Sequence, residues 1–231
     1  MSADIRELVA TASQVLGAAG HADLVWGHVS ARDPDGRGAW LKHSGWGMEE
    51  VTAERVHLVG YDGAVIEGGG PRHKEYPIHT EIFRARPDVH AVVHTHSRAA
   101  LALSASGQPL RPVSHEANFF VPPAVPHFTE TADLIQTPEL GSAMAAALGD
   151  ARAIFLVNHG IVCVGPDVPS AVVAAVLLDR ACSQQILTIQ AGPLTHWSDD
   201  CEALEKRSNV YGSAVNQVWE YLVRRLRSNG R

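Results

Sequence analysis

The spacing of apolar positions predicts several helices. Residues 4–19 place apolar side chains three and four positions apart, and Gly17 and Gly20 mark the end of that pattern, so an amphipathic helix is expected there. A further helix is expected to begin at Pro77, because proline suits a first helical turn. The other predicted helices are 98–105, which Ser97 can cap, 139–148, a long apolar helix at 168–190, and a more charged one at 202–227.

Short apolar runs between these helices predict strands. They cover residues 24–32, a segment beginning at 40, and residues 56–59, 64–66, 89–96, 153–157 and 161–164. Asp62 and Gly63 signal a hairpin, whereas the proline-rich stretch 107–138 predicts loops with short strands. This order favours one α/β domain over residues 1–231, with helices packed around a mostly antiparallel sheet.

Composition narrows the class of protein. Of 231 residues 45% are apolar and 19% are charged, which is ordinary for a soluble globular protein. A formal charge of −6 offers no basic stripe for a nucleic acid, no apolar signal segment is visible, and no run is expected to reach membrane-spanning length. Cys163, Cys182 and Cys201 form no closely spaced pair, which favours a reducing compartment. We therefore expect a cytoplasmic protein whose partner is a small molecule.

Histidine is unusually frequent, with 13 residues, and two of them end the strand predicted for 89–96. Successive side chains on a strand point to opposite faces, so His94 and His96 share a face and Thr95 points away. Two imidazoles about 6–7 Å apart along one strand can converge on one divalent ion. His90 has the same parity but lies roughly 13 Å away at strand rise, so it is interpreted as a structural or pocket residue.

Two more residues complete a candidate metal site. His159 precedes Gly160 at a sharp boundary between two apolar runs, where a backbone bend would aim the imidazole inward. Glu75 lies where a glycine-rich loop leads into a helix. Three imidazoles and one carboxylate suit zinc, manganese or iron, and spacing alone does not choose between them. The alternative is that His94 and His96 only form hydrogen bonds inside a sheet.

Several other residues have a structural alternative to a functional one. His79, one helical turn after Glu75, is either a partner that holds this carboxylate or a surface residue. Lys42 is either a pocket residue or solvated. The aromatic residues Trp26, Trp46, Phe119 and Phe120 either stack on a substrate ring or pack in the core. Surface or structural roles are expected for His21, His57, His127 and His196, and helix or subunit contacts for Asp179 and Arg180.

The candidate residues occur in five motifs that resemble the class II aldolase/adducin family. They are Gly27-His28-Val29-Ser30, Ser44-Gly45, Glu75-x-x-x-His79, His94-Thr95-His96-Ser97 and Asn158-His159-Gly160. The resemblance implies an α/β/α fold and a homotetramer with active sites between subunits. It also implies a divalent ion on His94, His96 and His159, with Glu75 as a fourth ligand or as the acid/base. Manganese or zinc is expected, with iron or cobalt also possible.

Departures from the family pattern concern the substrate. Sugar-phosphate aldolases of the family hold phosphate with an asparagine, a threonine-glycine pair and a serine pair. Those positions are occupied here by His28, by Ser44 and Gly45, and by His73 and Lys74. By resemblance these residues bind substrate, and cationic groups among them suit a carboxylate.

The aldolases protonate their intermediate with a tyrosine. In this chain that position falls near Glu116, so the resemblance leaves His115 or Glu116 as the replacement acid. Glu75, if released from the metal, is the other candidate proton donor.

The motifs of this chain are also similar to those of a smaller branch of the family. It contains decarboxylases of hydroxylated aromatic dicarboxylates, such as 3,4-dihydroxyphthalate and 3-hydroxy-2-methylpyridine-4,5-dicarboxylate. The resemblance therefore implies a metal-dependent carboxy-lyase of aromatic catabolism that takes a small carboxylated substrate. The alternatives are an aldolase on a hydroxy acid or a sugar-derived substrate, a non-catalytic head domain and an iron-dependent oxygenase.

Overall fold

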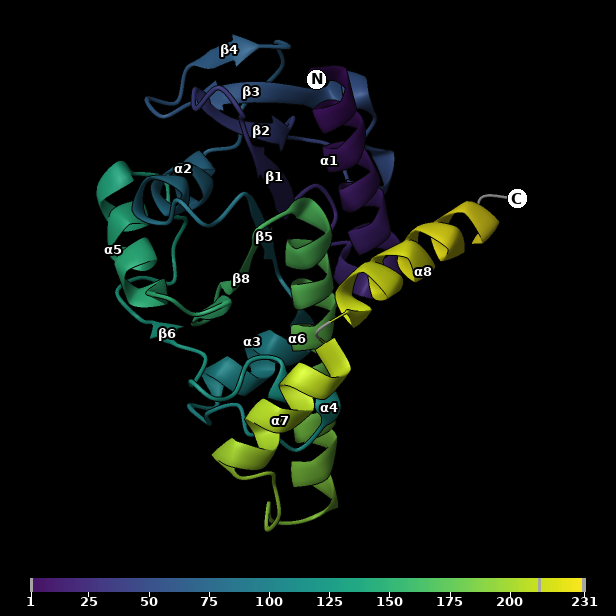
Figure 1. The fold of residues 1–231 in the computed structure, drawn as a ribbon. Helices are drawn as coiled ribbons and strands as arrows, with labels where there is room; N and C mark the ends of the chain where they lie inside the picture. Colours follow the sequence, from purple (N-terminus) through teal and green to yellow (C-terminus); the bar gives the residue numbers. More distant parts are fainter. Residues whose placement is uncertain (1, 212, 230–231) are drawn as a thin grey trace.

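The computed structural model describes residues 2–211 and 213–229 and contains one mixed sheet (Figure 1). Its eight strands lie in the order β4-β3-β2-β1-β5-β8-β7-β6. They are β1 (His28–Arg32), β2 (Gly38–Lys42), β3 (Val56–Gly60), β4 (Val65–Glu67), β5 (Ala91–Thr95), β6 (His127–Phe128), β7 (Ala153–Leu156) and β8 (Gly160–Gly165). All neighbours pair antiparallel except β6 with β7, so the predicted mostly antiparallel sheet is confirmed.

Helices cover both faces of this sheet. They are α1 (Ser2–Leu16), α2 (Tyr76–Ala85), α3 (Arg98–Ala105), α4 (His115–Asn118), α5 (Pro138–Leu148), α6 (Val168–Ala191), α7 (Asp200–Tyr211) and α8 (Ala214–Asn229). Helices α2 and α5 lie on one side, and α1, α3 and α6 lie on the other (Figure 1). The predicted single α/β domain with flanking helices is therefore the observed architecture.

The sheet separates two hydrophobic cores because strand side chains alternate between its faces. Val92 and Val162 pack with α2 and α5, whereas Val93 and Cys163 pack with α1 and α6. His94 shares the parity of Val92, and it pairs with Val162 of β8. Its imidazole therefore points to the α2 side of the sheet.

Several helices and strands begin or end where single residues in the sequence predict it. The Ser97 hydroxyl accepts a hydrogen bond from the Ala100 amide at 3.2 Å and caps α3, and Pro77 lies in the first turn of α2. The β3-β4 hairpin also forms as predicted. The strand predicted to start at residue 24 begins at His28 instead, because Asp23 and Trp26 close a turn in which Leu24 has a φ of 51°.

Two predictions about the C-terminal half are wrong. The single helix predicted for 202–227 is two helices, α7 and α8, and residue 212 between them lies outside the described residues. Helix α6 is long and apolar enough to cross a membrane by length and composition, contrary to the expectation that no run reaches that length. Half of its most apolar window is buried, and it packs on β5 and β8, as a core helix does.

Candidate active site

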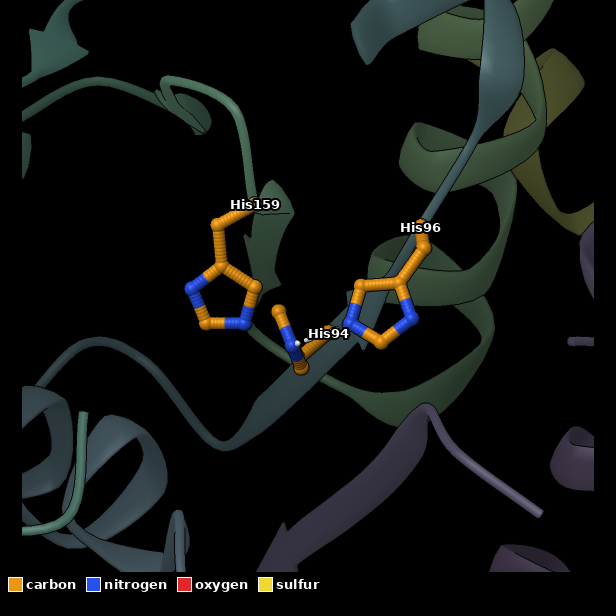
Figure 2. Close-up of side chains that lie close together, drawn as sticks. All are labelled: His94, His96 and His159. Carbon is orange, nitrogen blue, oxygen red and sulfur yellow. Dashed lines mark hydrogen bonds between the residues drawn. The ribbon is translucent and has the colours of Figure 1, made fainter. Parts of the chain in front are cut away.

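Three histidines meet at the end of β5 (Figure 2). His94 is on the strand, His96 follows it, and His159 comes from the turn between β7 and β8. One nitrogen of each ring lies within 4.8 Å of one nitrogen of the others. Gly160 allows this approach, because a Cβ at that position would lie 2.6 Å from the Thr95 carbonyl oxygen. The sequence prediction that these three residues come together is thus confirmed.

Hydrogen bonds fix the ring orientation of two of them. His94 Nδ1 donates to the Ile161 carbonyl oxygen at 3.0 Å, and His96 Nδ1 donates to Asp23 Oδ2 at 2.7 Å. Burial lowers the pKa of His94 well below its ordinary value, so this ring is neutral. With Nδ1 of each ring engaged elsewhere, the two Nε2 atoms lie 3.2 Å apart. Both are therefore placed to bind one metal ion.

The residues fit a divalent ion. Zinc with nitrogen ligands at about 2.0–2.1 Å separates neighbouring ligands by about 3.3 Å, close to the observed spacing of the two Nε2 atoms. Both ring nitrogens of His159 are buried without a hydrogen-bond partner among the described residues, which fits a role as a metal ligand. Hydrogen bonds from Nδ1 to a carboxylate or a carbonyl are also typical of metal-binding histidines.

Glu75, just before the first turn of α2, lies beside two of these three imidazoles. Its Oε1 lies 3.3 Å from His159 Nε2, and its Oε2 lies 3.7 Å from His94 Nε2. The Ile135 amide donates to Oε1 at 3.0 Å and holds the carboxylate in place. Burial alone would raise the pKa of Glu75. The neighbouring rings of His159, His28 and His94 lower it by more, so the pKa lies far below the usual range of a glutamate. Glu75 is therefore an ionised carboxylate that can complete a metal site.

His79 does not have either of its predicted roles. It is fully buried, and its Nε2 lies 2.6 Å from His28 Nδ1, whereas its Nδ1 lies 2.6 Å from Ser30 Oγ. His79 therefore holds His28 rather than Glu75, and it is not on the surface. His28 Nε2 in turn lies 3.8 Å from Glu75 Oε2, at the edge of the cluster.

Of the other predicted substrate-binding residues, His73 lies beside His28 at this edge. The His73 ring centroid is 4.5 Å from that of His28, and the Ser44 amide donates to the Pro71 carbonyl oxygen at 2.8 Å. That hydrogen bond places Ser44 and Gly45 beside the loop that carries His73 and Lys74.

Two of these residues are not the cations that the sequence suggested. Burial, followed by the charge of Lys42, lowers the pKa of His73 to about 3. Burial, followed by the neighbouring His73, lowers the pKa of His28 well below its ordinary value. Both rings are neutral near pH 7, and Lys74, which is exposed, remains as the cation of the group.

His115 is not brought to the cluster within this chain. It is exposed at the first residue of α4 and lines a separate cavity of about 360 Å³ with His196, Trp197 and Lys206. Its neighbour Glu116 forms an ion pair with Arg180 of α6 at 3.1 Å, which confirms a helix contact for Arg180. A catalytic role of His115 therefore stays a prediction that requires a second subunit.

The structural interpretation holds for some of the other residues. Phe119 and Phe120 are buried in the core beside α6. Trp46 is half-buried under the guanidinium of Arg55 and Trp26 is exposed, so neither packs in the core. His21 and His57 are buried, and His21 forms a hydrogen bond with Thr95 on the face opposite His94. His90 is exposed, so it is not a pocket residue.

Two residues near the site were missed or left open by the sequence. Asp23, the partner of His96, lies in the turn before β1, and no spacing signal marks it. Lys42 is completely buried, and its ammonium donates to the carbonyl oxygens of Val25 at 3.1 Å and Trp46 at 2.6 Å. It thus joins the turn that carries Asp23 to the loop that follows Ser44. Its position at the end of a buried strand was the only available signal.

Comparison with protein families agrees with this geometry. The model of the class II aldolase and adducin N-terminal domain matches residues 7–186. The chain belongs to the class II aldolase and adducin family.

Similar members of the family include lyases of two kinds. A 3,4-dihydroxyphthalate decarboxylase from Terrabacter is 33% identical over 237 residues and 96% of each chain. An aldolase II superfamily protein from Pseudomonas syringae has a TM-score of 0.87 and 27% identity over 99% of this chain and 94% of its own. An L-fuculose 1-phosphate aldolase from Glaciozyma antarctica has a TM-score of 0.83 and 26% identity over 98% and 91%. This class II aldolase family member thus has a histidine and glutamate cluster suited to a divalent metal.

Proposed function

We propose that the protein is a divalent-metal-dependent decarboxylase of a hydroxylated aromatic or pyridine dicarboxylate. The supporting observation is the convergence of His94, His96 and His159, with the ionised carboxylate of Glu75 beside His94 and His159. It occurs in a chain that aligns over 96% of its length with a 3,4-dihydroxyphthalate decarboxylase. Manganese or zinc suits this ligand set, and iron or cobalt is also compatible with it.

The residues of the chain have separate parts in this reaction. His94, His96 and His159 would hold a divalent ion, which would supply Lewis-acid polarisation to a ring hydroxyl and its adjacent carboxylate. Glu75, which is ionised, accepts the hydroxyl proton and delivers it to the ring carbon that bears this carboxylate. The bond from that carbon to the carboxylate then breaks, its electron pair restores the aromatic ring, and CO2 leaves. Hydrogen thus replaces the carboxyl group.

The second carboxylate of the substrate is assigned to the loops beside His28. Lys74 supplies the positive charge, and Ser44 with the Gly45 backbone supplies hydrogen-bond donors. His73, which is neutral, contributes a ring nitrogen rather than a charge. Because His115 does not reach the cluster within one chain, its proposed role as a proton donor requires the homotetramer with sites between subunits.

The test is decarboxylation by manganese-loaded and zinc-loaded protein. 3,4-Dihydroxyphthalate and 3-hydroxy-2-methylpyridine-4,5-dicarboxylate are incubated with each form, and CO2 and the ring product are measured. CO2 release by the native protein that is lost in His96→Ala supports the proposal. With metal shown to be bound, absence of CO2 from both compounds rejects these substrates.

The aldolase is the second candidate function. The fold is shared with an L-fuculose 1-phosphate aldolase at 26% identity, and the same cluster can polarise a carbonyl group. Release of an aldehyde from a hydroxy acid, without CO2, would establish this alternative.

A further inference from the structure

Three buried side chains form a hydrogen-bonded series that ends beside Glu75. Ser30 and His28 lie two residues apart on β1 and share a face of the sheet, and His79 of α2 lies against both. All three side chains are buried. The hydrogen bonds that join them are both 2.6 Å long, from Ser30 Oγ to His79 Nδ1 and from His79 Nε2 to His28 Nδ1. The last nitrogen of this series, His28 Nε2, lies 3.8 Å from Glu75 Oε2.

The direction of these hydrogen bonds follows from the Ser30 hydroxyl, which stands at one end of the series. Among the described residues, His79 Nδ1 is the only hydrogen-bond partner of the Ser30 hydroxyl, so the hydroxyl donates to it. His79 then carries its proton on Nε2 and donates to His28 Nδ1. His28 must therefore carry its proton on Nε2.

The reverse direction is disfavoured. It would leave the hydroxyl hydrogen of Ser30 buried without an acceptor, which shifts the equilibrium by about 5- to 100-fold toward the first direction.

This tautomer decides what His28 can do. Glu75 and His94 could form a second three-residue metal site together with His28. A ring nitrogen that carries a proton cannot bind a metal ion, so the ion belongs to the set that contains His96 and His159. His28 Nε2 is instead a neutral donor aimed at the space beside Glu75, where an oxygen of a bound ligand can accept its hydrogen bond.

We propose that Ser30 and His79 are positioning residues that lock His28 as an Nε2–H donor to an anionic substrate oxygen, such as a phenolate or carboxylate, beside Glu75. The tautomer itself follows from the structure alone, and the identity of the acceptor rests on the proposed function. Among the aldolases of the family this position is an asparagine, whose amide group is also a donor. The chain thus keeps a donor there and supplies it from a ring whose direction is set by two other residues.

Two variants of nearly equal shape separate a donor from an acceptor at position 79. In His79→Gln the amide oxygen accepts from Ser30 and the amide nitrogen donates to His28, so the tautomer is kept. In His79→Glu the carboxylate only accepts, so His28 must place its proton on Nδ1. The ring nitrogens of His28 are observed by long-range proton-nitrogen NMR of protein labelled in histidine, and His28→Gln assigns the signals.

The wild type and His79→Gln should show a protonated Nε2, and His79→Glu should show a protonated Nδ1. A wild type with Nδ1 protonated, or with both forms equally populated, overturns the proposal. This readout needs no substrate, so it separates the proposal from the assignment of the reaction. Should His79→Glu not fold, as judged by circular dichroism, Ser30→Ala replaces it. Loss of the single Nε2–H form in that variant supports the lock, and an unchanged spectrum overturns it.

Kinetics test the donor role with the substrate that the wild type decarboxylates. KM should rise about 10- to 100-fold in His79→Glu and change little in His79→Gln, because a hydrogen bond to a charged oxygen is lost only in the first. The metal content of both variants should equal that of the wild type. Equal KM values in the two variants reject the donor role. If the wild type releases no CO2 but shows the Nε2–H form, the reaction assignment fails and the lock stands.

Discussion

The buried ammonium of Lys42 should make the stability of the protein depend on pH in a way that one substitution removes. Burial lowers the pKa of Lys42 from 10.5 to about 8, and the charges of Glu49 and Glu50 only partly oppose this shift. Unfolding restores the ordinary value. Between about pH 8 and 10.5 the unfolded chain binds a proton that the folded chain has lost, so the free energy of unfolding rises with pH.

The magnitude follows from the two pKa values. Between pH 7 and pH 10 this single group should add about 2.5 kcal/mol to the free energy of unfolding, with most of the rise above pH 8. Lys42→Met has no proton to lose and lacks this contribution. The difference in unfolding free energy between wild type and variant should therefore change by the same amount across this range, in favour of the wild type as pH rises.

Urea unfolding followed by circular dichroism at pH 7, 8, 9 and 10 measures this difference. Lys206→Met is the matched control, because it removes a lysine from a partly exposed ion pair with Glu202 and reports the effect of losing a lysine charge elsewhere. Parallel curves for the wild type and Lys42→Met would refute the reasoning, since they would mean that the Lys42 ammonium titrates alike in the folded and unfolded chain.

Three further predictions concern the site and its frame. Asp23→Asn should weaken zinc or manganese binding about 10- to 100-fold, because its carboxylate holds His96 Nδ1 at 2.7 Å; an unchanged affinity in a competition titration would contradict this. Gly160→Ala should lower stability by about 1–3 kcal/mol, since its Cβ would meet the Thr95 carbonyl oxygen at 2.6 Å, and a wild-type melting temperature would reject that close approach. Ser97→Ala should cost about 1–2 kcal/mol in urea unfolding, because it removes both the cap of α3 and the hydrogen bond that the Ser97 hydroxyl donates to Asp179; an unchanged free energy of unfolding would contradict both contributions.

The predictable part of the site depends on local geometry. His94 and His96 share a direction because strand side chains alternate, and this holds wherever the strand lies in the fold. His159 was found because a glycine follows it at the end of a run. In the same way, the cap of α3 and the start of α2 follow from single residues, Ser97 and Pro77, that act within one helical turn.

The missed part depends on the order of strands in the sheet. The hydrogen bond of His96 to Asp23 spans 73 residues of sequence, and that of Ser30 to His79 spans 49. The first contact depends on β1 and β5 being neighbours, and the second depends on α2 packing against the face of β1. No apolar pattern in the sequence predicts either arrangement. The charges predicted for the histidines beside the site were wrong for a related reason. Spacing identifies an imidazole, but burial decides whether it carries a proton.

The pairing of β1 with β5 also locates the most informative departure from the aldolase pattern. His28 lies directly opposite His94 in the register of the two strands. Under the proposal above, a change of residue at position 28 alters a substrate contact and leaves His94, His96 and His159 in place. For this reason, His28 and the two residues that orient it are where substrate preference should be tested first.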